Sequence, residues 1–329
     1  MPRAFPFLLA LFAAMPAASA IASQPQSSPY AALAALEARV ATIGYRLTTA
    51  NAGWCPALQP QFGWIWGDPR LYDPARRTEA LAAYGASDTD APYIAAVAAG
   101  SPAGRAGLRV GGPVRSVNGG AIPPGKGDDP FARIAAAETL FASLPPTATA
   151  SLSTTGAQTV AVTATAGCAT DFRVDARDRP EGAADGRLVV VSAGLIQFAG
   201  DDNELAAPLA HELAHNILRH RARLDAAGVD RGIGKQFGRS ARLFKTTEIE
   251  ADRLSAWLLA GAGYDPHAAI RFWTRFGQRA GRPLFQAGTH PRWQDRVASI
   301  ETEVRAIDAA RAAGRPLLPP LIADPPPLE

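Results

Sequence analysis

The chain has 329 residues, 47% of them hydrophobic and 19% charged, so it can bury the cores of two ordinary domains, and general disorder is excluded. The formal net charge is only +3, and the basic residues are scattered among acidic ones, which gives no support for a nucleic-acid partner. We therefore expect a globular protein of two domains.

Residues 1–20, MPRAFPFLLALFAAMPAASA, have the layout of a secretory signal peptide. Arg3 precedes an apolar run, and Ala18-Ser19-Ala20 supplies the small residues of a cleavage site after Ala20. The run is shorter than the roughly 20 apolar residues that span a bilayer, and no later segment is apolar enough to do so. The sequence therefore predicts a periplasmic or otherwise exported protein whose mature chain has no transmembrane segment.

Cys55 and Cys168 are the two cysteines of the chain. In an oxidising compartment an even pair favours a disulfide, whereas two buried, unpaired thiols are the alternative. A bond between them would join the two ends of the segment that lies between these cysteines.

Residue patterns divide the rest of the chain into four parts. Residues 21–50 carry Ala and Leu at helical spacing and predict a leader helix at 30–48, whose role the sequence does not indicate. Residues 51–170 contain short β-rich runs broken by Gly and Pro. Residues 171–312 are mostly helical, and residues 313–329 form a proline-rich tail that cannot continue a helix.

The β-rich part contains AAVAAGSPAGRAGLRVGGPVRSVNGGAIP, which resembles the PDZ domain of exported bacterial proteases, and one helix is expected at 130–144. The residues that carry the resemblance are Val97, Gly100-Ser101-Pro102-Ala103, Ala106-Gly107-Leu108, Gly111, Val114, Val117-Asn118-Gly119 and Ile122. PDZ domains bind an extended peptide as an added strand, so the resemblance implies a site that holds unfolded substrate. A β-domain that only packs against its neighbour is the alternative.

The segment AHELAHNILRHR, residues 210–221, places His211 and His215 four residues apart around Glu212. A capping pattern beginning at Asp201 and a leucine stripe every four residues predict a helix over 202–219. On that helix the two histidines lie about 40° apart and one turn along, close enough to bind one metal ion.

A third ligand is expected from TTEIEADRLSAWLLAGAG, residues 246–263, where a helix should start at capping threonines and stop at Gly261. Glu248 and Asp252 are four apart and share one face of this helix. Glu250 is equally able to coordinate, but it points away from Glu248, and both cannot serve one ion.

His211-Glu212-Leu213-Ala214-His215 and Glu248-Ile249-Glu250-Ala251-Asp252 together resemble the M48 family of zinc metallopeptidases, a gluzincin group. The resemblance implies an α+β fold, with a mostly helical zincin-like domain and a small sheet at 171–312, after the PDZ-like domain. It also implies one Zn²⁺ per chain held by His211, His215 and Glu248, with Glu212 as general base. Asp252 would accept a hydrogen bond from a ligand imidazole; a surface salt bridge is its alternative role.

GTHPRWQDRVASI, residues 288–300, resembles a further motif of the same family, in which His290 and Arg296 are the notable residues. The resemblance implies that His290 either stabilises an oxyanion or occupies the open metal position, and a structural histidine is the alternative. His220 and His267 have no such neighbours in the sequence and are interpreted as structural.

Two further segments border the expected cleft. The resemblance to family M48 implies that residues 188–191 form a strand beside the metal, and that the exposed edge of this strand aligns a peptide. Residues 221–245, rich in Gly and Arg, form either a lid or a simple surface connection.

The predicted function is that of an exported zinc endopeptidase that cleaves extended or unfolded polypeptides, in envelope protein quality control. The alternative is a PDZ-bearing periplasmic chaperone or assembly factor with a gated or silent zinc site. Neither the substrate nor the oligomeric state follows from the sequence.

Overall fold

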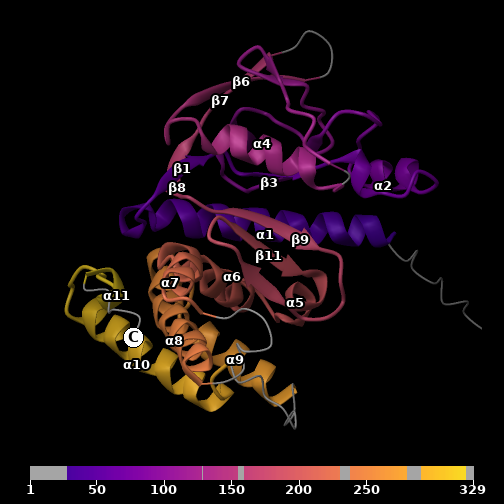
Figure 1. The fold of residues 1–329 in the computed structure, drawn as a ribbon. Helices are drawn as coiled ribbons and strands as arrows, with labels where there is room; N and C mark the ends of the chain where they lie inside the picture. Colours follow the sequence, from indigo (N-terminus) through magenta and orange to yellow (C-terminus); the bar gives the residue numbers. More distant parts are fainter. Residues whose placement is uncertain (1–27, 128, 155–158, 230–237, 280–289, 324–329) are drawn as a thin grey trace, which may run out of the picture.

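The computed structural model describes residues 28–127, 129–154, 159–229, 238–279 and 290–323. About half of these residues are helical and the strands form small sheets, consistent with the expected α+β class. In Figure 1 a long first helix lies between an upper part with most of the strands and a lower, mainly helical part. The expected signal peptide at residues 1–20 lies outside the described residues.

The elements follow one another in this order. The helices are α1 (Pro29–Ala50), η1 (Ala52–Trp54), η2 (Pro69–Leu71), α2 (Arg77–Ala83), α3 (Pro102–Arg105), α4 (Ala132–Ala142), α5 (Ala193–Phe198), α6 (Asp202–Ile217), α7 (His220–Ala226), α8 (Gly238–Gly261), α9 (His267–Arg279), α10 (Trp293–Ala312) and α11 (Pro320–Ala323). The strands are β1 (Leu58–Gln61), β2 (Trp64–Gly67), β3 (Tyr93–Val97), β4 (Ser116–Val117), β5 (Gly120–Ala121), β6 (Thr149–Ser153), β7 (Thr159–Thr163), β8 (Thr165–Cys168), β9 (Asp171–Asp175), β10 (Gly182–Ala184) and β11 (Leu188–Ser192).

Helix α1 is the leader helix that the sequence predicts, and it is a core element. Ser28 caps it by accepting a hydrogen bond from the backbone N–H of Ala31 at 3.2 Å. Val40, Ile43 and Leu47 are almost completely buried. The helix packs against β3 of the upper part and against β9 and α6 of the lower part (Figure 1). It therefore joins the two parts of the molecule.

The upper part has a hydrophobic core of its own. The antiparallel sheet β5-β4-β6-β7, the β2–β3 pair and helix α4 supply its side chains, among them Ile94, Leu152 and Phe141. Strand β1 pairs with β8, the last strand of this part. The disulfide between Cys55 and Cys168, with Cα atoms 5.3 Å apart, lies at this pairing and confirms the expected bond. It fastens the two ends of the upper part and limits the unfolded chain.

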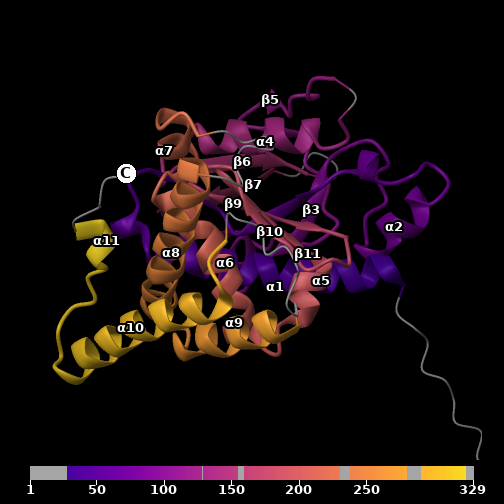
Figure 2. The same cartoon turned by 60° about the horizontal axis from the view of Figure 1, so that its bottom comes forward.

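The lower part places a helix pair beside a small sheet. Helices α6 and α8 pack along each other, and α9 and α10 cover them (Figure 2). The sheet has the strand order β10-β11-β9. Strand β11, at the expected position, pairs with β10 on one side and β9 on the other. The expectation that this strand offers an exposed edge is therefore wrong, because β10 covers that edge and is itself the outer strand.

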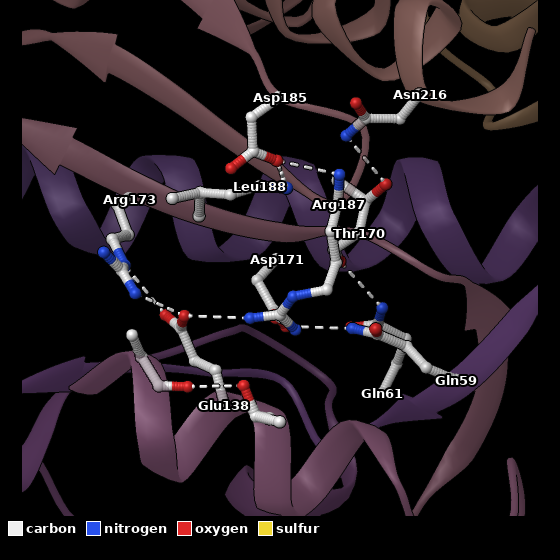
Figure 3. Close-up of polar contacts among 12 residues, drawn as sticks. Gln59, Gln61, Glu138, Thr170, Asp171, Arg173, Asp185, Arg187, Leu188 and Asn216 are labelled. Atoms are coloured by element: carbon white, nitrogen blue, oxygen red, sulfur yellow. Dashed lines mark hydrogen bonds and ion pairs between the residues drawn. The ribbon is translucent and has the colours of Figure 1, made fainter. Parts of the chain in front are cut away.

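A polar network joins the two parts where α4 faces the sheet of β9 and β11 (Figure 3). The carboxylate of Glu138 on α4 accepts hydrogen bonds from Arg173, and Arg187 lies 3.3 Å from it. Arg187 also pairs with Asp171, which accepts a hydrogen bond from Gln59 of β1 at 2.9 Å. Glu138 is only 5% exposed, so this charge is buried between the two parts.

Helix α8 begins earlier than the sequence suggests. It starts at Gly238, so Thr246 and Thr247 lie inside it, and the expected threonine cap is wrong. The hydroxyl of Thr247 donates to the carbonyl oxygen of Phe244 at 2.8 Å, a bond that threonine makes within helices as well as at their ends. The helix ends at Gly261, as expected.

Much of the expected lid or connection is also helical. Its described residues include most of α7 and the start of α8, whereas residues 230–237 lie outside the described part of the chain. The described part of the proline-rich tail, up to residue 323, includes the short helix α11. Within the described residues, the helices lack an apolar stretch of the length needed to cross a membrane.

Candidate metal centre and cleft

Helix α6 forms where the sequence predicts it and carries the two histidines of the candidate site. Asp201 caps it by accepting a hydrogen bond from the backbone N–H of Glu204 at 2.8 Å, while Glu204 accepts one from Gly200 at 2.9 Å. The stripe of apolar side chains, Leu205, Leu209, Leu213 and Ile217, is buried in the core. These contacts fix the helix, so His211 and His215 project together toward α8.

Three potential ligands converge between α6 and α8. The Nε2 atoms of His211 and His215 are 3.2 Å apart. The two carboxylate oxygens of Glu248 lie 3.5 Å from them, one oxygen against each imidazole. One ligand atom from each residue lies within 4.8 Å of the others. Two imidazoles and a carboxylate that converge in this way are a donor set typical of a catalytic zinc site.

Charge in the site also fits a cation. Burial raises the pKa of Glu248, but His211, His215 and Arg296 outweigh this and hold it well below its usual value. Burial lowers the pKa of His215 well below 6.5. Burial also lowers the pKa of His211, yet Asp252 and Glu248 raise it to about 9. The carboxylates therefore favour positive charge where the imidazole Nε2 atoms meet.

Asp252 lies behind His211, one helical turn from Glu248. Its Oδ1 is 2.9 Å from Nδ1 of His211, and Arg296 donates two hydrogen bonds to it, at 2.6 and 2.8 Å. The side chain is fully buried. The alternative role, a surface salt bridge with Arg253, does not fit, because Arg253 pairs with Glu303 at 2.6 Å. Asp252 is thus placed to orient the His211 ring.

Glu250, the rival ligand, points away from the three converging atoms. Its carboxylate is 2.9 Å from Nε2 of His220 and 2.6 Å from Nη1 of Arg223. Nδ1 of His220 lies 2.9 Å from Nδ1 of His215. This contact does not follow from the sequence, which predicts a structural role for His220; the structure places that buried histidine directly beside His215. His267 is exposed and pairs with Asp308 on the surface.

Glu212 lies beside the ligands and against the outer strand of the sheet. It is half-buried, and burial raises the pKa of its carboxyl to about 7. A Cβ atom on Gly182 of β10 would lie only 2.7 Å from Oε1 of Glu212. Glycine therefore permits the strand to approach the carboxylate this closely.

Two cavities meet at the site. One of about 240 Å³ and one of about 360 Å³ share the lining residues Gly182, Ala183, His211, Glu212, Glu248 and His290. The larger cavity extends toward Trp273 and Phe276, and the smaller toward Leu224 and Phe244. An extended chain that follows β10 would thus pass the three ligands with room on both sides.

His290 lies at the rim of this cleft. Its Nε2 is 3.9 Å from Oε2 of Glu248, and the side chain is 53% exposed. Arg296, from α10, is buried against the ring of Trp273, with its guanidinium carbon 3.7 Å from the ring centre. The structure therefore brings both residues of the 288–300 segment to the site, although residues 280–289 lie outside the described part.

Comparison with known proteins gives matches in this part of the chain. Residues 180–233 and 227–304 match the model of peptidase family M48. The mitochondrial metalloendopeptidase OMA1 of Schizosaccharomyces pombe is 31% identical over 137 residues, which is 35% of this chain and 41% of that protein. A putative beta-barrel assembly-enhancing protease of Vibrio cholerae is 29% identical over 151 residues, 36% of this chain and 31% of that protein.

The OMA1 metalloendopeptidase of Arabidopsis thaliana is 30% identical over 153 residues, 39% of this chain and 31% of that protein. The chain thus matches about a third to two fifths of the length of these relatives. The family match contains the converging histidines and Glu248, and it supports a metalloprotease function for this part of the chain.

Proposed function

We propose that the chain is an exported zinc-dependent endopeptidase. The observation that carries this proposal is the convergence of His211, His215 and Glu248, with the half-buried carboxylate of Glu212 beside them. These three side chains would hold one Zn²⁺. When bound, Zn²⁺ supplies Lewis-acid chemistry, because it acidifies water and polarises a peptide carbonyl.

Glu212 would act as the general base. Its carboxylate takes a proton from the attacking water while the water oxygen bonds to the peptide carbonyl carbon. The same group then passes the proton to the amide nitrogen as the C–N bond breaks, which releases an amine and a carboxylic acid, and the acid then loses its proton to solvent. Burial supports this role, because it raises the pKa of the Glu212 carboxyl above its usual value and so makes the carboxylate a stronger base.

Substrate is proposed to bind as an extended chain along β10. This strand is the outer one of its sheet, and Gly182 and Ala183 line both cavities. Main-chain hydrogen bonds to such a strand ask little of the substrate sequence, which suits unfolded polypeptides. His290, at the rim, is proposed to contact the reacting carbonyl or to limit access to the metal.

The upper part, residues 51–170, is proposed to be a PDZ-like domain that precedes the peptidase domain at 171–312. Its small sheets, helix α4 and separate core support this division. The space between β2 and α4 is filled by Phe62, Trp64, Trp66 and Phe141, whose rings stack or meet edge to face. A cavity of only about 50 Å³ adjoins them, so substrate is proposed to reach the zinc cleft directly.

Export to the periplasm, with signal-peptide cleavage after Ala20, is also proposed. The disulfide supports it, because such bonds persist in oxidising compartments. The Vibrio cholerae relative is named for a role in beta-barrel assembly, and we propose a related role in envelope protein quality control. The chaperone alternative differs in one respect, since it does not require Glu212 to act as a base.

Zinc content tests the ligand set. We expect one zinc per wild-type chain, and we expect Glu248→Ala to weaken binding by more than the roughly 100-fold that loss of an outer-shell partner causes. Glu301→Ala, on the exposed face of α10, is the control and should keep the zinc. Equal zinc affinity in the wild type and Glu248→Ala would remove Glu248 from the ligand set.

A further inference from the structure

A chain of buried polar groups extends from His215 away from the cleft. Nδ1 of His215 is 2.9 Å from Nδ1 of His220, whose Nε2 is 2.9 Å from Oε2 of Glu250. Arg223 donates to the same carboxylate oxygen at 2.6 Å. His220 and Glu250 are 1% and 4% exposed. These contacts are therefore shielded from water.

The backbone brings His220 into this position by a sharp turn. Helix α6 ends at Ile217, and α7 begins at His220. Between them Arg219 adopts the left-handed conformation, with φ 53° and ψ 38°. Such a conformation is uncommon for a residue other than glycine, and here it turns the chain between the two helices.

The polar chain fixes the positions of the protons. A carboxylate accepts hydrogen bonds only, so Nε2 of His220 carries a proton and donates it to Glu250. Because Arg223 also donates to Glu250, a neutral His220 is sufficient for this pair, and the neutral imidazole has a lone pair on Nδ1. Nδ1 of His215 must then donate to that lone pair, so Nε2 of His215 has its own lone pair directed at Glu248 and His211.

We propose that His220 and Glu250 are positioning residues that hold His215 in the Nδ1–H tautomer, with Nε2 ready to bind metal. Asp252 acts on His211 in the same sense through one direct contact at 2.9 Å. For His215 the carboxylate of Glu250 acts through an intervening imidazole. The role in metal binding rests on the proposed function, whereas the tautomer of His215 can be tested without metal.

The tautomer is tested by nuclear magnetic resonance of the metal-free full chain with ¹⁵N-labelled histidine. The chain has five histidines, so single substitutions assign each ring. Long-range ¹H–¹⁵N correlations distinguish protonated from unprotonated ring nitrogens. We expect the Nδ1–H form for His215 and the Nε2–H form for His220. An Nε2–H form of His215 in the wild type would overturn the proposal.

Zinc affinity, measured by competition with a chelator, tests the consequence. His220→Phe keeps a ring and removes the acceptor, so we expect the zinc Kd to rise about 10- to 100-fold. His220→Asn places an oxygen near the position of Nδ1 and should restore most of the affinity. His267→Phe, at the exposed histidine paired with Asp308, is the control and should leave the Kd unchanged.

Three further outcomes are decisive. If His220→Phe does not fold, His220→Asn is compared with His220→Gln, whose amide lies nearer the position of Nε2; Asn should bind zinc more tightly, and equal affinities would contradict the proposal. If the wild type binds no zinc but His215 is in the Nδ1–H form, the proposed function fails and the tautomer assignment stands. Unchanged zinc affinity in His220→Phe would overturn the positioning role alone.

Discussion

Gly182 controls how closely strand β10 approaches Glu212. A Cβ at this position would lie 2.7 Å from Oε1 and 3.3 Å from the carboxyl carbon of Glu212. We expect Gly182→Ala to displace the carboxylate and to lower kcat/KM by about 10- to 100-fold, because misplacement by about 1 Å has costs of this order. Zinc content should stay unchanged, since the three ligands lie on the helices.

The measurement for Gly182→Ala is peptide cleavage beside zinc content. Gly53→Ala is the matched control, because a Cβ there meets no heavy atom within 4 Å and the variant should keep full activity. Wild-type kcat/KM in Gly182→Ala would show that Glu212 does not depend on this contact.

Some residues of the candidate site could be predicted from the sequence, and others could not. The spacing of His211 and His215 predicts that they meet, because a helix places positions four apart on one face, whereas Glu248, on another helix, is predicted to join them only from the resemblance to family M48. His220 could not be predicted, since on a continuous helix a residue five positions after His215 points about 140° away. The left-handed Arg219 breaks that helix, and the local residues give no signal for such a turn.

Helix α1 buries a carboxyl group that should make stability depend on pH. Glu37 is 8% exposed, and burial raises its pKa from 4.5 to about 7, with Tyr84 offsetting part of the effect. The folded state therefore binds a proton more tightly than the unfolded chain. The stability that the folded protein gains from this proton is fully present below about pH 4.5 and is lost as the pH rises through about 7.

As the pH rises between these values, we expect Glu37 to lower the free energy of unfolding by up to about 3 kcal/mol, since one pKa unit corresponds to about 1.4 kcal/mol. Glu37→Gln should remove this loss, as measured by urea unfolding from pH 4 to 8 against the wild type. Glu301→Gln, on an exposed helix face, should follow the wild type. Identical pH profiles for Glu37→Gln and the wild type would contradict the account.

The elements differ in how well their sequences define them. Helix α6 has a local cap and a regular apolar stripe, so its position follows from the sequence, although it ends two residues before the predicted Arg219. The start of α8 does not, because threonines bond within a helix as readily as at its end. One edge of strand β11 is covered by β10, which has only three residues, none of them typical of strands. The sequence therefore does not indicate that β11 is the central strand of its sheet.

At the scale of the whole molecule, Glu138 ties the upper part to the sheet of the lower part (Figure 3). Its buried carboxylate forms ion pairs with two arginines, Arg173 and Arg187. Removal of one partner from a buried ion pair costs about 3–5 kcal/mol, and Arg187 is partly exposed, so we expect Glu138→Gln to lower the unfolding free energy by about 2 kcal/mol.

Urea unfolding measures this difference. Glu79→Gln, which removes an exposed pair with Arg76 on α2, is the control and should change stability by less than about 0.5 kcal/mol. Equal stability of the two variants would show that the network between the parts contributes nothing measurable.

The arrangement of the upper and lower parts could not be predicted from the sequence. Local patterns separate a β-rich part from a helical part, and the cysteine pair marks the ends of the first. Helix α1 is buried by partners from both parts, and its own sequence of Ala and Leu does not identify them. Likewise, Glu138 and Arg173 are ordinary surface types in the sequence, and only the fold brings them together.

Cleavage of an unfolded protein by the wild type and Glu212→Gln, both with full zinc, is the most direct test of the proposed function. Casein is a suitable substrate, and Glu248→Ala reports the loss of metal. We expect cleavage by the wild type and its loss, by a factor of at least about 100, in Glu212→Gln at unchanged zinc content. Equal cleavage by both proteins, or zinc-loaded wild type without any cleavage, would contradict it.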